Sequence, residues 1–149
     1  MLDWLKNNVE SARSKLALEV TKFKNRDFMD ALVAGCALVS AADGNISAIE
    51  KQRMAGFIQN SDELKVFDLK DVITSFNGFC QKFEFDAEIG KAEALRAVGK
   101  IRNKPDAARL LVRVCCAIGS SDGQFDESEK TVCRGICVEL GLNPADFGL

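Results

Sequence analysis

The amino-acid sequence predicts an all-α protein that folds as a single domain over residues 1–149. Apolar residues recur every three or four positions along most of the chain, which is the spacing of one face of a helix. Only one short stretch, residues 83–89, alternates between apolar and acidic residues as a strand does. The length, with 47% hydrophobic and 28% charged residues, is typical of one soluble globular domain. Because no second strand-like stretch is available for pairing, we expect residues 83–89 to connect two helices.

About seven helices are expected, and their bounds follow from the apolar spacing. In the first, over residues 2–23, a stripe of apolar side chains begins with Leu2, Leu5 and Val9. The others are expected over residues 28–41, 47–58, 68–83, 88–102, 105–119 and 126–140. Pro105 suits the first turn of a helix, where a backbone N–H would have no partner, and Gly141 suits a helix C-terminus.

An internal repeat relates two parts of the chain, residues 28–60 and 107–141. Each part contains an apolar helix, a turn with Asp-Gly and a second, amphipathic helix. Residues 79 positions apart match: Cys36 with Cys115, Asp43-Gly44 with Asp122-Gly123, Glu50-Lys51 with Glu129-Lys130, and Gly56 with Gly135. Duplicated helical hairpins commonly pack about a pseudo-two-fold axis. We therefore expect the two turns to occupy comparable positions in the fold.

The two turns are candidate metal-binding segments. Residues 43–50 and 122–129 both fit the latter half of an EF-hand loop, with an Asp, a Gly at the bend and a Glu six residues after the Gly. The carboxylates of the first half of such a loop are missing, so neither turn can be a calcium loop alone. Together the turns offer Asp43, Glu50, Asp122 and Glu129. These four carboxylates could hold a divalent cation such as Ca²⁺, in one shared site or in two open ones.

Helix capping is the alternative interpretation of the same turns. Ser47 and Glu50, like Asp126 and Glu129, have the spacing of a capping box, in which each Glu satisfies the N-terminus of its own helix. Gly44 and its counterpart in the second turn could end the preceding helices. Capping leaves unexplained why an Asp stands at the same place in both turns, and both interpretations stay open.

Composition excludes several classes of function. The chain has no His and no Tyr, which removes the Ser-His-Asp triad and the commonest metal ligand. The net charge of −2 argues against general nucleic-acid binding. The longest apolar stretch, residues 31–39, is far shorter than the ~20 residues of a membrane-spanning helix. Acidic and amide residues stand near the N-terminus, where a signal peptide would be apolar, so we expect a cytoplasmic protein with reduced thiols.

The six cysteines are expected to pack in the core, because free Cys is among the most buried residue types. Cys133 and Cys137 lie one helical turn apart on an apolar stripe. Two thiols at this spacing could bind a soft ion or react with an oxidant, which is the alternative.

Charge is unevenly distributed along the chain. Residues 1–26 carry six Lys or Arg and three Asp or Glu, which suits either a membrane-surface helix or a helix packed on the core. A second basic stretch, either a solvated face or a docking surface for an acidic partner, contains Arg96, Lys100, Arg102, Lys104, Arg109 and Arg113. The carboxylates of residues 83–89 could extend an acidic surface beside the turns or face solvent from a connection; they are Glu84, Asp86 and Glu88.

Several contiguous stretches resemble the TerB family of tellurite-resistance proteins, over almost the whole chain. These stretches are residues 43–51, 61–68, 83–91, 121–123 and 143–149. The resemblance implies an all-helical domain of two similar halves with an acidic, metal-chelating face. It also implies partners, namely TerC-like membrane proteins and TerD-like calcium-binding proteins. The first turn is less acidic than the second, where Asp126 and Glu127 stand in place of Ser47 and Ala48.

The sequence and the resemblance together predict a non-enzymatic cytoplasmic adaptor of a tellurite-resistance and stress-response system. It would bind a divalent cation through the paired turns and dock to membrane-associated partners, with peripheral association at the inner face of the membrane as an option. One alternative is thiol chemistry on tellurite or other oxidants. Another is a helical interaction module that binds no metal.

Overall fold

Every helix predicted between residue 25 and the C-terminus is present in the structure, a computed structural model that describes residues 25–42, 48–60, 65–120 and 125–149. In chain order the elements are α2 (Arg26–Ser40), α3 (Ala48–Gln59), α4 (Leu69–Phe85), α5 (Ala87–Gly99), α6 (Pro105–Gly119), α7 (Glu127–Leu140) and the 3-10 helix η1 (Pro144–Phe147). No strand occurs among these residues, so the all-α class is confirmed. The count of about seven helices stays a prediction, because the first was expected over residues 2–23, outside the described residues.

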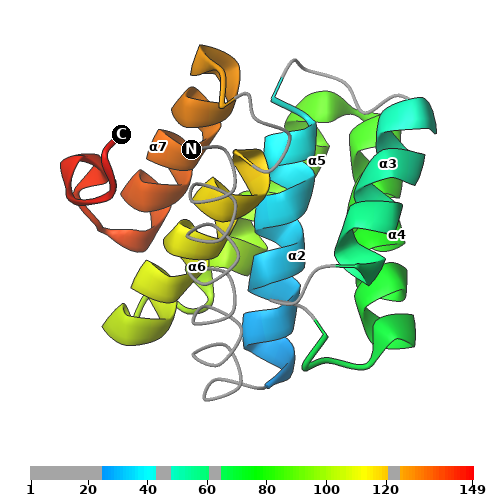
Figure 1. The fold of residues 1–149 in the computed structure, drawn as a ribbon, viewed down its shortest axis with the longest axis horizontal. Helices are drawn as coiled ribbons and strands as arrows, with labels where there is room; N and C mark the ends of the chain where they lie inside the picture. The colour runs from blue at the N-terminus through cyan, green and yellow to red at the C-terminus, as the bar shows by residue number, and fades with distance from the viewer. Residues whose placement is uncertain (1–24, 43–47, 61–64, 121–124) are drawn as a thin grey trace, which may run out of the picture.

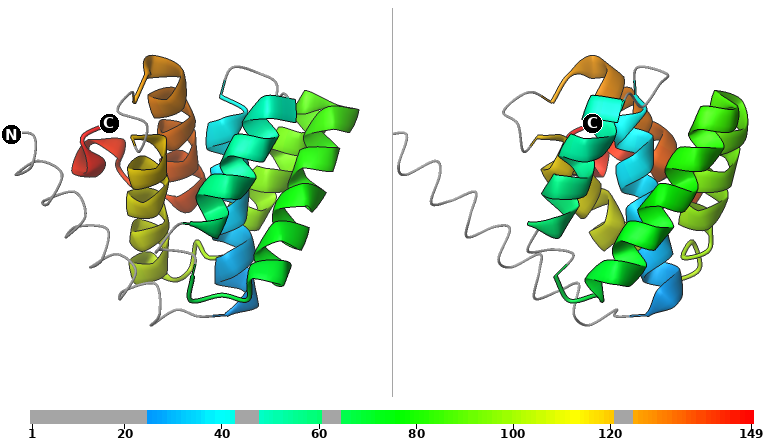
Figure 2. Two further views of the ribbon diagram at one scale, coloured as in Figure 1. Left: turned by 45° about the vertical axis from the view of Figure 1, so that its right-hand side comes forward. Right: turned by 90° about the vertical axis from the view of Figure 1, so that its right-hand side faces the viewer.

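Helix α2 lies at the centre of the fold. It covers the longest apolar stretch of the sequence, and its residues 31–39 are all buried. Figure 1 shows α6 and α7 on one side of α2, with α3 and α4 on the other, and Figure 2 gives two further views of this arrangement. A helix that is apolar on all sides must be surrounded by other elements, and α2 packs against α3, α4, α5, α6 and α7. No helix in the described part of the chain is long and apolar enough to cross a membrane.

Short polar side chains fix where the helices begin, as local rules predict. The side chain of Asn25 accepts a hydrogen bond from the backbone N–H of Phe28 at 2.8 Å and caps α2. Asp68 caps α4 in the same way, with 2.9 Å between its Oδ1 and the backbone nitrogen of Lys70. At the C-terminus of α7, Gly141 adopts the left-handed conformation with φ 72°, as expected of a residue that ends a helix.

The expected connection over residues 83–89 is mostly helical, which corrects the prediction. Helix α4 continues to Phe85 and α5 begins at Ala87, so Asp86 alone separates them. The carboxylate of Asp86 accepts hydrogen bonds from the N–H groups of Glu88 and Ile89, at 2.9 and 3.1 Å. The alternating pattern has a local reason: Phe83 is buried at the end of α4, whereas Phe85 is 82% exposed.

Helices α4 and α5 approach each other closely just after this sharp connection. A Cβ atom added to Gly90 would lie 2.6 Å from the Cα of Phe83, which is too close for any residue with a side chain. Gly90 is therefore required for the packing of α5 on α4.

Candidate functional site

Of the four predicted metal ligands, the structure describes the side chain of one, Glu129. Asp43 and Asp122 lie outside the described residues. Glu50 lies in α3, and the position of its side chain is not described. Glu129 lies in the first turn of α7, with its side chain described. Whether the four carboxylates come together stays a prediction.

Glu129 forms a capping box with Asp126, as the alternative interpretation predicts. The Oδ1 atom of Asp126 accepts a hydrogen bond from the backbone N–H of Glu129 at 2.8 Å. In return the Oε1 atom of Glu129 accepts one from the backbone N–H of Asp126 at 3.4 Å. The second oxygen, Oε2, lies 3.5 Å from where a Cβ on Gly119 would stand, at the end of α6. One oxygen of Glu129 thus caps α7, and the other lies beside the residue that precedes the second turn.

The helix ends that flank the two turns lie toward the same end of the molecule. In both Figure 1 and Figure 2, α2 and α6 end near the top, where α3 and α7 begin. A cavity of about 240 Å³ lies between the end of α2 and the interior of α7, since Ala41 and Ala42 after α2 line it together with Thr131 of α7. Glu88 of α5 lines the same cavity. One carboxylate of the alternating stretch therefore lines the same cavity as the residues that precede the first turn, and whether an acidic surface extends beside the turns stays a prediction.

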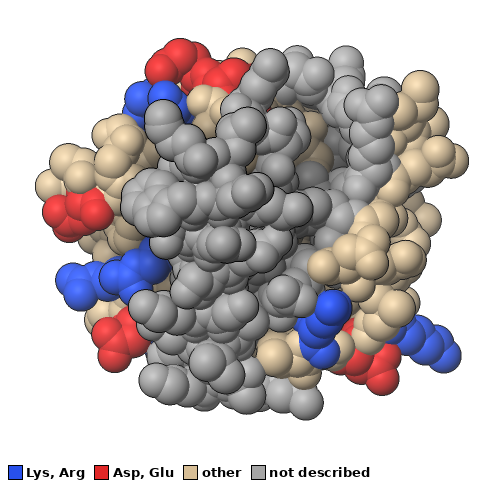
Figure 3. All heavy atoms as spheres, in the orientation of Figure 1, with Lys and Arg blue, Asp and Glu red and all other residues tan. Residues whose placement is uncertain are grey.

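No preformed metal site occurs in the described part of the chain. None of its groups of three or more Cys, Asp or Glu side chains is arranged to hold a metal ion. On the face seen in Figure 3, the acidic and basic side chains of the described residues lie side by side along the margin.

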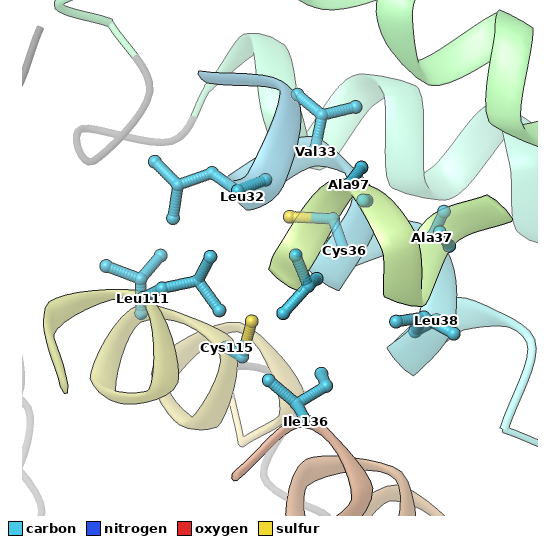
Figure 4. Close-up of a cluster of buried hydrophobic side chains, with 14 of the residues drawn as sticks. Leu32, Val33, Cys36, Ala37, Leu38, Ala97, Leu111, Cys115 and Ile136 are labelled. Carbon is cyan, nitrogen blue, oxygen red and sulfur yellow. The ribbon is translucent and has the colours of Figure 1, made fainter. Parts of the chain in front are cut away.

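Five of the six cysteines are buried in the core, as predicted. The buried ones are Cys36, Cys80, Cys115, Cys133 and Cys137, whereas Cys116 is half-buried. Figure 4 shows Cys36 of α2 and Cys115 of α6, which the repeat matches, in one buried cluster with Ile136 of α7. A Cβ on Gly35 would lie 2.6 Å from the Sγ of Cys115, so α2 and α6 are in close contact here. The pseudo-two-fold axis itself stays a prediction.

The thiols differ in acidity for identifiable reasons. Burial is the main cause that raises the pKa of Cys115 well above its usual value, and burial raises that of Cys137 to about 11. Cys133 of α7 and Cys116 of α6 share a side-chain hydrogen bond. This bond lowers the pKa of Cys116, and together with burial it raises the pKa of Cys133. Cys116 is therefore the thiol most suited to react with an external reagent.

The sequence pattern paired Cys133 with Cys137, one turn apart on α7, and did not indicate the contact between Cys133 and Cys116. These two residues lie on different helices, 17 positions apart in the chain. The one available signal of this contact was the doublet Cys115-Cys116. Neighbouring residues of a helix point in different directions, so the two thiols cannot both face the core equally.

Comparison with known proteins gives a consistent result. The family model described as "Tellurite resistance protein TerB" matches residues 29–149. A protein from Alcaligenes sp., "Tellurium resistance protein TerB", is 42% identical over 112 residues, which cover 75% of this chain and 92% of that relative. No solved structure matches the chain. The family match extends over the repeat from residue 29 and over all the described helices from α3 onward, and the chain belongs to the TerB family of tellurite resistance proteins.

Proposed function

We propose that this TerB-family protein is a non-enzymatic cytoplasmic adaptor that binds a divalent cation through its two turns. The ligands are Asp43, Glu50, Asp122 and Glu129. The observation that carries the proposal is the position of the described helix ends: those of α2, α3, α6 and α7 that flank the turns lie toward one end of the fold. Family membership supports the role in tellurite resistance.

The chemistry of the proposed site follows from its ligand type. Carboxylate oxygens suit hard cations such as Ca²⁺ and Mg²⁺. Four carboxylates that approach one another without a cation repel, so a bound ion would stabilise the turns. In the capping box Glu129 uses its Oε1 atom, and its Oε2 atom lies toward the end of α6.

The partners proposed for the adaptor are TerC-like membrane proteins and TerD-like calcium-binding proteins. A cation held in two half-sites leaves coordination positions that the carboxylates of a second protein can fill, because Ca²⁺ takes six to eight oxygen ligands. Docking would then depend on the cation, and the protein would join the membrane periphery through its partner.

An NMR titration with Ca²⁺, Mg²⁺ and Zn²⁺ tests the cation site. The expected result is saturable shifts of the backbone amides that flank the turns, those of Ala41, Ala42, Phe125 and Asp126. The double variant Asp43→Asn/Asp122→Asn keeps the size of both side chains and should abolish these shifts. Asp106→Asn is the matched control, because Asp106 is an exposed first-turn Asp at the start of α6. Equal shifts in the double variant and the native protein would overturn the assignment.

Thiol chemistry is a second candidate function, and the contact between Cys116 and Cys133 specifically favours it. The half-buried Cys116 would react first with an oxidant such as tellurite, and Cys133 would complete a disulfide. In that step the two thiols lose two protons and two electrons, and the oxidant accepts both electrons. The test is mass spectrometry after exposure to tellurite. Loss of two hydrogens that Cys116→Ser prevents supports this function, and an unchanged mass contradicts it.

A further inference from the structure

A cleft between α2, α4 and α5 collects basic side chains that are far apart in the sequence. Its volume is about 420 Å³, which is within the range of small-molecule sites. The basic residues that line it are Arg26 of α2, Lys82 of α4, Arg96 of α5 and Lys100 at the end of α5. Thr74 and Ser75 of α4 add hydroxyl groups to the same lining.

The two carboxylates of the cleft are already engaged by other lining residues. Asp30 pairs with Arg26, with 3.4 Å between Oδ2 and Nε, and it also accepts a hydrogen bond from the Ser75 hydroxyl at 2.9 Å. Glu93 pairs with Lys82, whose Nζ lies 3.6 Å from the carboxylate. Four basic and two acidic side chains line the cleft, so its net charge is +2.

Arg96 and Lys100 carry the excess positive charge. No ion pair among the described residues involves either side chain, and the two lie four positions apart, so their like charges repel along one face of the helix. Both also border a neighbouring cavity of about 570 Å³, where Arg102 adds a positive charge and Glu139 a negative one, so that three basic side chains and one acidic side chain line it. The strongest positive potential of this surface is therefore expected where the two cavities meet.

We propose that this cleft binds the phosphate group of a small molecule or inorganic phosphate. Arg96 supplies a planar guanidinium suited to two parallel hydrogen bonds with a phosphate. Lys100 supplies the second excess charge, while Lys82, whose Nζ lies 5.4 Å from the centre of the Phe79 ring, is paired with Glu93 in the same lining. An oxyanion relieves the repulsion between Arg96 and Lys100, neither of which forms an ion pair with a described carboxylate. This inference is independent of the cation site at the turns.

The experiment is an NMR titration with inorganic phosphate at constant ionic strength and without added divalent cations. We expect saturable shifts confined to the amides of the cleft, such as those of Ser75, Gly78 and Ala97. Arg96→Gln and Lys100→Gln should each weaken binding about tenfold, as the loss of one charge-assisted hydrogen bond implies. Arg109→Gln, an exposed Arg on α6 outside the cleft, should leave the affinity unchanged.

A second arm with AMP distinguishes the sources of the phosphate. Tighter binding of AMP than of phosphate identifies a phosphorylated small molecule, and equal or weaker binding identifies the free ion; both support an oxyanion site. A different explanation of Arg96 and Lys100 is their favourable position near the C-terminus of α5. That explanation predicts no saturable shifts, or equal affinities for native protein and Arg96→Gln, and either result would overturn the proposal.

Discussion

Replacing Gly35 with Ala tests how closely α2 packs on α6. The new Cβ would lie 2.6 Å from the Sγ of Cys115, about 1 Å less than an ordinary van der Waals contact. Such overpacking of a buried site costs about 1–3 kcal/mol, whereas Ala gains about 0.5–1 kcal/mol over Gly in a helix interior. The net expectation is a loss of up to about 2.5 kcal/mol. In the control Gly78→Ala, where the Cβ meets nothing within 4 Å, the helical gain alone should appear.

A double variant assigns the cost to one atom. With Cys115→Ala in place the sulfur is gone, and the nearest remaining neighbour of the new Cβ is Cδ2 of Leu111 at 3.8 Å, an ordinary contact. Gly35→Ala should then become stabilising, so the coupling energy between the two sites is about 1–3 kcal/mol. The assay is urea unfolding followed by circular dichroism, with free energies from linear extrapolation. Equal stabilisation by Gly35→Ala in both backgrounds would refute the close packing of α2 on Cys115.

Three further predictions concern a cap, a helix crossing and a thiol. Asp126→Ala removes the N-cap of α7 and should lower the free energy of unfolding by about 1 kcal/mol, measured by urea unfolding; no loss would contradict the capping box. Gly90→Ala places a Cβ against the backbone of Phe83, which cannot rotate away, and should cost about 3 kcal/mol or more in the same assay. The pKa of Cys137 rises from its usual 9.0 to about 11 on folding, so the native state holds this proton longer and stability should fall as pH rises from 9 to 11. Cys137→Ala should reduce that fall, and an unchanged pH dependence would show that Cys137 does not titrate as described.

Local signals in the sequence predicted most of the helices well. Helix α6 has the predicted bounds, Pro105 to Gly119, because a proline in the first turn marks its start. Helix α7 ends at Leu140, with Gly141 as its cap, and begins with the capping box of Asp126 and Glu129, both of which are local motifs. The connection between α4 and α5 was predicted less well. The alternation of apolar and acidic residues suggested an extended connection. Instead, Asp86 alone ends α4 and caps α5, and this sharp junction needs the close crossing of the two helices at Gly90.

The candidate sites depend on contacts between helices, which periodicity does not reveal. The spacing within α7 pointed to Cys133 and Cys137, whereas the contact of Cys133 with Cys116 arises only when α6 packs on α7. The basic cleft likewise combines Arg26 with Arg96, 70 positions away in the chain. The sequence did indicate Arg96 and Lys100 as part of a basic stretch, but not the residues of α2 and α4 that face them.

Thermal unfolding with and without divalent cations tests the central proposal, a cation held by Asp43, Glu50, Asp122 and Glu129, most directly. A ligand at a hundredfold excess over its dissociation constant adds about 2.7 kcal/mol of stability, which corresponds to about 5–10 °C in a protein of this size. Millimolar Ca²⁺, Mg²⁺ or Zn²⁺ should therefore raise the Tm of the native protein. The cation should leave Asp43→Asn/Asp122→Asn unchanged, and without cation that variant should be no less stable than the native protein, because it carries less repulsion. An unchanged Tm of the native protein with all three cations would contradict the metal site and leave the turns as helix caps.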